Sequence, residues 1–317
     1  MPADTAREPP GDPLTVALVS ARAARDLDED LPPLEAALRA RGVAVRIACW
    51  DDASVDWSAV DLALLRSTWD YVERLEEFLQ WAERTARVTR LANPPALIRW
   101  NTDKHYLAEL AHARVPAVAS TFVEPADSPA RAAGAVAGFL ERDPCAEFVV
   151  KPAVGAGSRD AQRYPRTAAA AATAHAQRLL QRNRSVLLQP FLDSVDVHGE
   201  TALIYFAGRF SHAICKGSLL RPEAPPTDAL FAPETITPRI PGADELEVGA
   251  LALAALAGAP GLAHLAPPLY ARVDLLRDSR GAPCVLEMEL TEPSLFFQHA
   301  PGSAERFAAA IVACIAP

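Results

Sequence analysis

The acidic residues near the end of the chain are spaced as metal ligands would be. Two strand-like runs flank a turn at residues 280–283; the first carries Arg272 and Asp274, and the second carries Glu287 and Glu289. Side chains two positions apart point to the same face of a strand, so each pair shares a face. Carboxylate oxygens are what Mg²⁺ takes when it also binds substrate phosphates. The hairpin indicates the floor of a nucleotide-phosphate site, although a charged, solvent-facing hairpin would show the same alternation.

A second phosphate-binding pattern follows an apolar strand predicted at residues 147–151. Lys151 ends that strand, and a loop of small residues with Gly155, Gly157 and Ser158 comes next. Small residues let backbone N–H groups approach a phosphate, and the strand fixes the direction of the ammonium group. Because the lysine precedes the glycines, the spacing matches neither a P-loop nor a Rossmann fingerprint. The pattern favours an anion-binding loop, with an ordinary strand-to-helix turn as the alternative.

The strand predicted at residues 186–189 leaves the core into a short connection, Gln189-Pro190-Phe191-Leu192. The carbonyl of Pro190 can accept from the exocyclic amine of adenine, and the N–H of Leu192 can donate to a ring nitrogen. Proline lacks a backbone donor but keeps its carbonyl, so it is compatible with this role. By itself such a segment is more often a plain core strand.

Strands and helices alternate in the first part of the chain. Strands are expected at residues 14–20, 43–49 and 61–66, and helices at 31–41 and 72–84. This alternation predicts a parallel sheet with right-handed crossovers, and therefore a doubly wound α/β unit. Ligands of such units bind at the carboxyl ends of the strands.

Four side chains follow the third of these strands, at the predicted ligand edge: Arg66, Ser67, Trp69 and Asp70. Together they offer a cation, a hydroxyl, an aromatic wall and an anion, which suits a zwitterionic, amino-acid-like compound. The alternative is that Trp69 packs a loop and Arg66 pairs with Asp70.

The two prolines that follow Asn93 mark a boundary, because each removes a backbone donor and fixes the backbone. Beyond them the pattern becomes α+β. Helices are expected at 102–113, 128–141, 166–183, 244–257 and 304–315, and further strands at 118–123, 201–206 and 210–216. We therefore expect an N-terminal α/β domain at residues 1–93, a central subdomain at 94–190 and a C-terminal subdomain at 191–317.

Composition narrows the class of protein. The 317 residues are 50% hydrophobic and carry a formal net charge of −9, which argues against a general nucleic-acid binder. The five cysteines form no Cys-x-x-Cys pair, which suits a reducing cytoplasm. The start of the chain lacks the apolar core of a signal peptide, and no run reaches the roughly 20 apolar residues of a membrane span. A cytoplasmic protein that binds neither nucleic acid nor membrane is expected.

The order of these parts resembles the ATP-grasp superfamily of carboxylate–amine ligases. The matching parts are Lys104 before a helix, Lys151 with its loop, the segment 189–192, Glu200 opening an antiparallel run, Lys216, Arg272-x-Asp274 and Glu287-x-Glu289. The resemblance covers roughly residue 93 to the end. Within the superfamily, segments 66–71, 98–104 and 286–293 look most like the branch that includes the cyclo-ligase forming D-cycloserine from O-ureido-D-serine.

The resemblance implies an N-terminal α/β domain followed by two α+β subdomains that clamp ATP. Lys104, Lys151 and the loop with Gly155, Gly157 and Ser158 would bind phosphates, Gln189, Pro190, Phe191 and Leu192 would bind adenine, and Glu200 would lie near the ribose. Asp274, Glu287 and Glu289 would hold Mg²⁺, with Mn²⁺ as an alternative. Arg272, Lys151 and Lys216 would be the catalytic cations: Arg272 would steady the transferred phosphoryl group or the tetrahedral intermediate, and Lys216 would be another phosphate contact. Many relatives carry Asn at the position of Glu289, and a third carboxylate there should strengthen metal binding.

The implied reaction is an ADP-forming amide ligation. A substrate carboxylate would attack the γ-phosphate of ATP, and an amine would capture the acyl phosphate, within one amino-acid-like molecule or between two. The intact set of lysines and acids favours activity over a silent ATP-binding module or regulator, and a small-molecule phosphotransferase would differ only after transfer. The loop at 155–158 is expected to close as a lid. A homodimer is possible.

Overall fold

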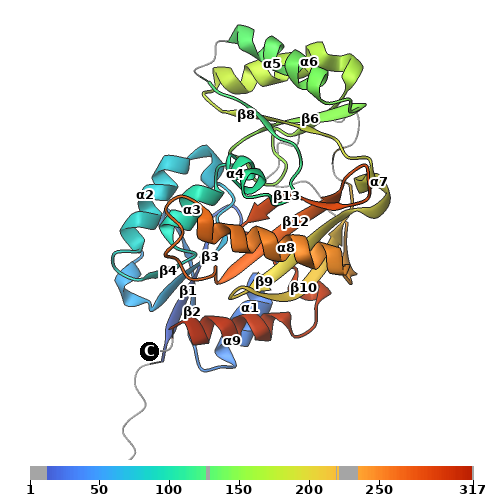
Figure 1. The fold of residues 1–317 in the computed structure, drawn as a ribbon. Coiled ribbons are helices and arrows are strands. Elements are labelled where there is room, and N and C mark those ends of the chain that lie inside the picture. Colours follow the sequence, from blue (N-terminus) through green and yellow to red (C-terminus); the bar gives the residue numbers. More distant parts are fainter. Residues whose placement is uncertain (1–12, 126–128, 219, 221–234, 316–317) are drawn as a thin grey trace, which may run out of the picture.

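The computed structural model describes residues 13–125, 129–218, 220 and 235–315. Its first layer is a parallel sheet with the strand order β2-β1-β3-β4 (Figure 1). The strands are β1 (Thr15–Ser20), β2 (Ala44–Cys49), β3 (Leu62–Ser67) and β4 (Arg90–Ala92). Helices α1 (Leu31–Arg39) and α2 (Leu75–Thr85) connect them. Strand β3 is buried along its whole length, as expected for a parallel sheet covered on both faces. The predicted doubly wound unit is confirmed.

The second layer is a five-stranded antiparallel sheet with the order β11-β10-β9-β12-β13. Its strands are β9 (Glu200–Phe206), β10 (Arg209–Lys216), β11 (Ile236–Arg239), β12 (Tyr270–Arg277) and β13 (Pro283–Glu289). Helix α8 (Ala243–Ala255) lies across this sheet, and the last helix, α9 (Ser303–Ile315), packs against α1 of the first layer (Figure 1). Phe307 of α9 is fully buried in a core shared by both sheets. The first and second layers therefore form one packed body.

The third sheet has the order β5-β8-β6-β7 and carries α5 (Pro129–Arg142) and α6 (Ala169–Gln181) on one side, at the top of Figure 1. Its strands are β5 (Thr121–Val123), β6 (Glu147–Pro152), β7 (Gln162–Pro165) and β8 (Val186–Pro190). Phe148, Val150, Leu179 and Leu188 belong to its separate hydrophobic core. Strand β6 places Lys151 at its carboxyl end, where the loop of small residues begins.

The helix expected at residues 102–113 corresponds to α4 (Tyr106–His112), which begins later than predicted, and a separate helix, α3 (Pro95–Asn101), precedes it. They are separate because the backbone N–H of Lys104 donates to the carbonyl of Ala153, 3.0 Å away in the loop after β6. Both helices bury apolar side chains, such as Leu97 and Leu107, in the core of the five-stranded sheet. Five short elements were not expected from the sequence: β4, β7, β11, α3 and α7 (Ser194–His198).

The predicted helix at 166–183 begins later, at Ala169, after a single 3-10 turn. The domain limits at 93/94 and 190/191 stay predictions. Within the ranges that the structure describes, no helix combines the length and the apolarity that crossing a bilayer would need.

Candidate active site

A cavity of about 580 Å³ lies where the three sheets meet. Its wall includes segments of the first layer, the loop after β6, the connection after β8 and the β12–β13 hairpin. Most of the residues predicted for the site line it: Lys104, Lys151, Gly155, Gly157, Ser158, Gln189, Pro190, Phe191, Leu192, Glu200, Lys216, Arg272, Asp274, Glu287 and Glu289. Residues from distant parts of the sequence thus meet in one space.

The hairpin presents its charges in register. Arg272 lies opposite Glu289, and Asp274 lies opposite Glu287, on strands β12 and β13. The Arg272 guanidinium donates to both oxygens of Asp274, with Nε to Oδ1 at 2.8 Å and Nη2 to Oδ2 at 2.9 Å, and it also pairs with Glu289. Lys216 Nζ donates to Asp274 Oδ2 at 2.7 Å. Burial alone would raise the pKa of Asp274, but Arg272 and Lys216 outweigh it and hold that pKa far below its usual range.

Glu287 and Glu289 differ in their charge environment. The Glu287 carboxylate lies 2.8 Å from Lys104 Nζ. Burial would raise the pKa of Glu287, but Lys104 and Lys151 lower it below its ordinary value. Burial raises the pKa of Glu289 to about 7 despite the nearby Arg272. Each glutamate keeps one carboxylate oxygen outside these ion pairs.

The predicted metal ligands Asp274, Glu287 and Glu289 are therefore held by cations. In the described part of the chain no three acidic, histidine or cysteine side chains already converge as a metal site. The donor set still fits Mg²⁺ chemically, since three carboxylates share the cavity-facing side of one hairpin and two of them retain a spare oxygen. Metal binding would require them to exchange lysine and arginine contacts for the metal.

Two lysines approach the hairpin, Lys104 from the turn between α3 and α4 and Lys151 from β6 of the third sheet. Lys104 Nζ donates to the carbonyl of Gly155 at 2.8 Å while it pairs with Glu287, so it joins the loop to the hairpin. Lys151 Nζ has neither an ion pair nor a hydrogen bond among the residues described. Burial lowers the pKa of Lys151 to about 8, while the charge of Glu287 acts in the opposite direction. An ammonium group that lacks its own partner is suited to a ligand's negative charge.

The loop after Lys151 adopts backbone conformations that favour small residues. Gly157 has a φ of 62° and Ser158 a φ of 60°, both in the left-handed region. Arg159 follows and pairs with Glu73 of the first layer at 2.7 Å. The loop thus reaches from β6 across the cavity mouth to the N-terminal sheet.

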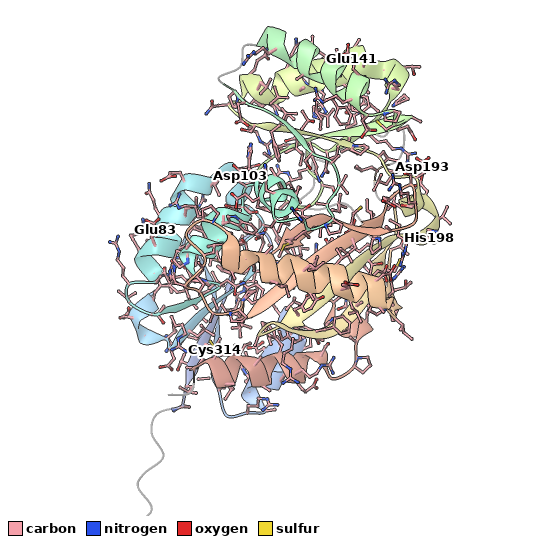
Figure 2. The ribbon with its side chains drawn as sticks, viewed as in Figure 1. Glu83, Asp103, Glu141, Asp193, His198 and Cys314 are labelled. Atoms are coloured by element: carbon pink, nitrogen blue, oxygen red, sulfur yellow. The ribbon has the colours of Figure 1, made fainter. Side chains whose placement is uncertain are left out.

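The connection after β8 has main-chain groups free for a ligand. The N–H of Phe191 donates to the carbonyl of Glu147, which makes Phe148 and Pro190 a non-hydrogen-bonded pair. The Pro190 carbonyl therefore points away from β6, and the N–H of Leu192 has no protein acceptor among the described residues. The chain then enters α7, which Asp193 and His198 flank at the edge of the molecule (Figure 2).

The side chains around this connection form contacts within the protein. Gln189 is buried and donates to Ser120 Oγ at 3.0 Å, and the Arg163 guanidinium lies 3.5 Å from the centre of the Phe191 ring. Glu200, at the start of β9, pairs with Lys216, and burial raises the pKa of Glu200 to about 8.

The predicted substrate residues do not converge. Trp69 lines the cavity, and its Nε1 donates to the carbonyl of Glu292 at 3.1 Å. Arg66, Ser67 and Asp70 lie behind the wall. Ser67 shares a 2.8 Å hydrogen bond with Ser20, and Asp70 accepts from Trp50 at 2.9 Å.

Arg66 is 1% exposed, and it donates to the Pro293 carbonyl at 2.9 Å. It lies 3.7 Å from Asp30, so the alternative pairing with Asp70 is not found. These side chains do lie at or just after the end of β3, as predicted. Side chains along β3 point alternately to its two faces, however, and this places Arg66 in the core.

The cavity wall also contains residues that were not predicted as site residues, among them Asp28, Tyr71 and Glu292. Asp30, beside the first of them, accepts the backbone N–H groups of Leu295, Phe296 and Phe297. This contact joins segments more than 260 positions apart, so only the folded chain reveals it. The local sequence offered one indication of this part of the site: Glu292 is a further acidic residue three positions after Glu289.

Solved structures with the same architecture identify the class. An ATP-grasp ligase, PsnB, superposes with a TM-score of 0.62 at 18% identity over 95% of this chain and 99% of that chain. The D-alanine–D-alanine ligase of Bacillus anthracis superposes with a TM-score of 0.64 at 14% identity over 96% of this chain and 97% of that chain. The fold is that of the ATP-grasp ligases.

Sequence similarity identifies the family. The family model of the N-terminal domain of D-cycloserine synthetase DcsG matches residues 16–93. The cycloserine biosynthesis protein DcsG of Streptomyces lavendulae is 43% identical over 306 residues, which are 95% of this chain and 99% of that protein. The crystal structure of D-cycloserine synthetase DcsG superposes with a TM-score of 0.88 at 42% identity, over 95% of this chain and 99% of that chain. The chain belongs to the DcsG family of ATP-dependent ligases.

Proposed function

We propose that this protein uses Mg²⁺ and ATP to activate the carboxylate of an amino-acid-like molecule as an acyl phosphate, releases ADP, and forms an amide by attack of a nitrogen nucleophile. The observation that supports this most strongly is the meeting of Lys104 and Lys151 with Asp274, Glu287 and Glu289 in one cavity. Lys104 already contacts Glu287, and the charge of Lys151 acts on the same carboxylate. Groups for phosphate and for metal therefore face each other.

The residues along the cavity suggest how ATP would lie. The free carbonyl of Pro190 and the free N–H of Leu192 would bind the adenine edge. Lys104, Lys151 and the backbone of Gly155 to Ser158 would bind the phosphates. In related folds, PsnB was solved with Mg and ADP, and the Bacillus anthracis ligase was solved with ATP. These relatives support the same nucleotide for this chain.

Asp274, Glu287 and Glu289 are the residues that would hold Mg²⁺, whose charge, when it is bound, neutralises phosphate oxygens. The protein's own cations do related work. Arg272 donates to two of these carboxylates, and once they turn to the metal its guanidinium can stabilise the negative charge of the reacting phosphoryl group.

The chemistry has two steps. A substrate carboxylate oxygen forms a bond to the γ-phosphorus, and the bond from that phosphorus to the β-γ bridging oxygen breaks, so that ADP leaves. A nitrogen then attacks the acyl carbon, and inorganic phosphate leaves. Water would destroy the acyl phosphate between the steps, so a cavity covered by the 155–158 loop favours ligation over hydrolysis.

The family membership suggests O-ureido-D-serine as the substrate. Its carboxylate would be phosphorylated, and the nitrogen bonded to its side-chain oxygen would close the ring. Loss of the carbamoyl group to water, as carbon dioxide and ammonia, balances the conversion to D-cycloserine. The relative with 43% identity, a cycloserine biosynthesis protein, supports this assignment.

The test is to incubate the protein with Mg-ATP and O-ureido-D-serine, and to follow ADP, inorganic phosphate and product mass. Equal release of ADP and phosphate with the mass of D-cycloserine is expected. A silent ATP-binding module would release neither, and a phosphotransferase would release ADP while its product kept the phosphate. Either result would refute the proposed ligation.

A further inference from the structure

The cavity contains a buried carboxylate that has no ion pair with any of the described residues, although the charge of Lys104 acts on it. Glu292 is 7% exposed and lines the cavity just beyond the hairpin. The three hairpin acids each contact a lysine or an arginine, whereas the Glu292 side chain is hydrogen-bonded by the neutral hydroxyl of Tyr71. Within the described ranges, Glu292 forms no ion pair. Burial of an unpaired carboxylate is unfavourable, so the site is suited to a cation that arrives with a ligand.

A second buried carboxylate lies on this side of the cavity, and one of its oxygens accepts the backbone N–H of Asp30 at 3.0 Å. Asp28 is 6% exposed and lines the cavity, and its Oδ2 has no hydrogen-bond partner among the described residues. Arg66 connects the two acids: it donates to the carbonyl of Pro293, next to Glu292, and its charge acts on Asp28. Two buried acceptors thus stand where the first layer meets the segment after β13.

Glu292 is held in a fixed position by residues of the first layer. Trp69 Nε1 donates to its carbonyl at 3.1 Å, and Tyr71 holds its side chain. Phe296 lines the same cavity in a left-handed conformation, with its N–H 3.1 Å from Asp30 Oδ2. Trp69, Tyr71 and Phe296 add aromatic side chains to this part of the wall, and the Arg272 guanidinium already lies 5.6 Å from the centre of the Phe296 ring, as cations do over aromatic faces. A fixed carboxylate beside aromatic side chains is a site for an ammonium group.

We propose that Glu292, positioned by Tyr71 and Trp69, binds the α-ammonium group of the substrate, and that Asp28 provides a second acceptor. This inference rests on the proposed function for the identity of the reaction, and it adds the residues that bind the amino group of the substrate. The site selects α-amino acids with a free amino group over carboxylic acids that lack one. Binding of the amino group near Glu292 directs the substrate carboxylate toward Lys104, Lys151 and the β12–β13 hairpin.

The test compares three variants and two substrates. Glu292→Gln keeps the shape of the side chain and removes its charge, and Tyr71→Phe removes the hydroxyl that positions it. Glu83→Gln is the matched control, because Glu83 lies on the outer side of α2, far from the cavity wall (Figure 2), and pairs with Arg99 at the surface. The substrates are O-ureido-D-serine and its analogue with hydrogen in place of the α-amino group. KM is measured for each substrate and for Mg-ATP.

For O-ureido-D-serine, Glu292→Gln should raise KM about 10- to 100-fold, the usual effect of losing a charged hydrogen bond. KM for Mg-ATP should change less than about threefold, and Glu83→Gln should match the wild type. The wild type should reject the analogue by about the same factor, and Glu292→Gln should no longer distinguish the two substrates. Tyr71→Phe should give a smaller change in the same direction.

Equal KM values of the wild type for the two substrates would overturn the proposal, as would full discrimination by Glu292→Gln. The first of these measurements needs no variant, so it remains decisive if Glu292→Gln fails to fold. Absence of any ADP release by the wild type with O-ureido-D-serine would instead refute the proposed function. Failure of the subsite and failure of the reaction are therefore distinguishable.

Discussion

We predict that Lys151 lowers the stability of the ligand-free protein, although the residue is needed for activity. Its ammonium group has no ion pair with any of the described residues, and burial lowers its pKa from an ordinary value of 10.5 to about 8. At about 1.4 kcal/mol for each pH unit, this difference corresponds to about 3 kcal/mol of unfavourable free energy for the charged form. We therefore predict that Lys151→Met stabilises the ligand-free protein at pH 7 by about 1–3 kcal/mol and abolishes ATP turnover.

The sign of the effect depends on pH. Below pH 8 the lysine is charged in both the folded and the unfolded protein, so the full penalty is present in the wild type. Between about 8 and 10.5 the folded protein loses the proton first, and the penalty disappears. The stability advantage of Lys151→Met should therefore be largest at pH 7 and vanish as the pH approaches 10.5.

Thermal unfolding of both proteins at pH 7 and near pH 10, without nucleotide, measures this advantage, and release of ADP measures activity. Saturating Mg-ATP should raise the unfolding midpoint of the wild type and leave that of Lys151→Met nearly unchanged, because binding stabilises only a competent folded state. A variant that is less stable than the wild type at pH 7, or that turns over ATP normally, would refute the reasoning.

Three further predictions concern the metal site, pH dependence and packing. Glu289→Asn should keep the activity but raise the Mg²⁺ concentration needed for half-maximal turnover roughly tenfold, because one negative ligand is lost. An unchanged Mg²⁺ concentration at half-maximal turnover would contradict the role of Glu289 as a metal ligand. Burial lowers the pKa of His175 from 6.5 to about 4, so the wild type should lose about 3 kcal/mol of stability as the pH falls from 6.5 to 4. His175→Phe should not show this loss, and parallel pH profiles of the two proteins in urea unfolding would contradict the prediction. Gly249→Ala should destabilise the folded protein by about 1–3 kcal/mol in calorimetry, because the new Cβ would lie 2.6 Å from Leu203 Cδ1. In the control Gly134→Ala the new Cβ meets nothing within 4 Å, so this variant should be as stable as the wild type or more stable.

Much of the site could be predicted because its parts are local patterns. Lys151 follows an apolar strand and precedes small residues, and Arg272, Asp274, Glu287 and Glu289 alternate along two strands of one hairpin. Such patterns fix the direction of a side chain within its own element. The order of the elements then resembled one superfamily, and the fold and the relatives confirmed that resemblance.

The rest depended on contacts between distant segments. Glu292 and Tyr71 are separated by more than 200 positions, and their hydrogen bond exists only because the segment after β13 packs on the first layer. Arg66 was predicted to face the ligand, but it is fully buried and pairs with Asp30. The helix expected at 102–113 begins only at Tyr106, because the backbone N–H of Lys104 donates to the carbonyl of Ala153 in the loop after β6. Periodicity within one element contains no information on these partners.

The central claim is that two lysines and three acids bind the same magnesium triphosphate from opposite sides of one cavity. A crystal structure with Mg²⁺ and a non-hydrolysable ATP analogue tests it most directly. Adenine should lie at Pro190 and Leu192, the phosphates should contact Lys104 and Lys151, and a metal should bridge them to Glu287 or Glu289. A nucleotide bound elsewhere, or phosphates that contact neither lysine, would contradict the account.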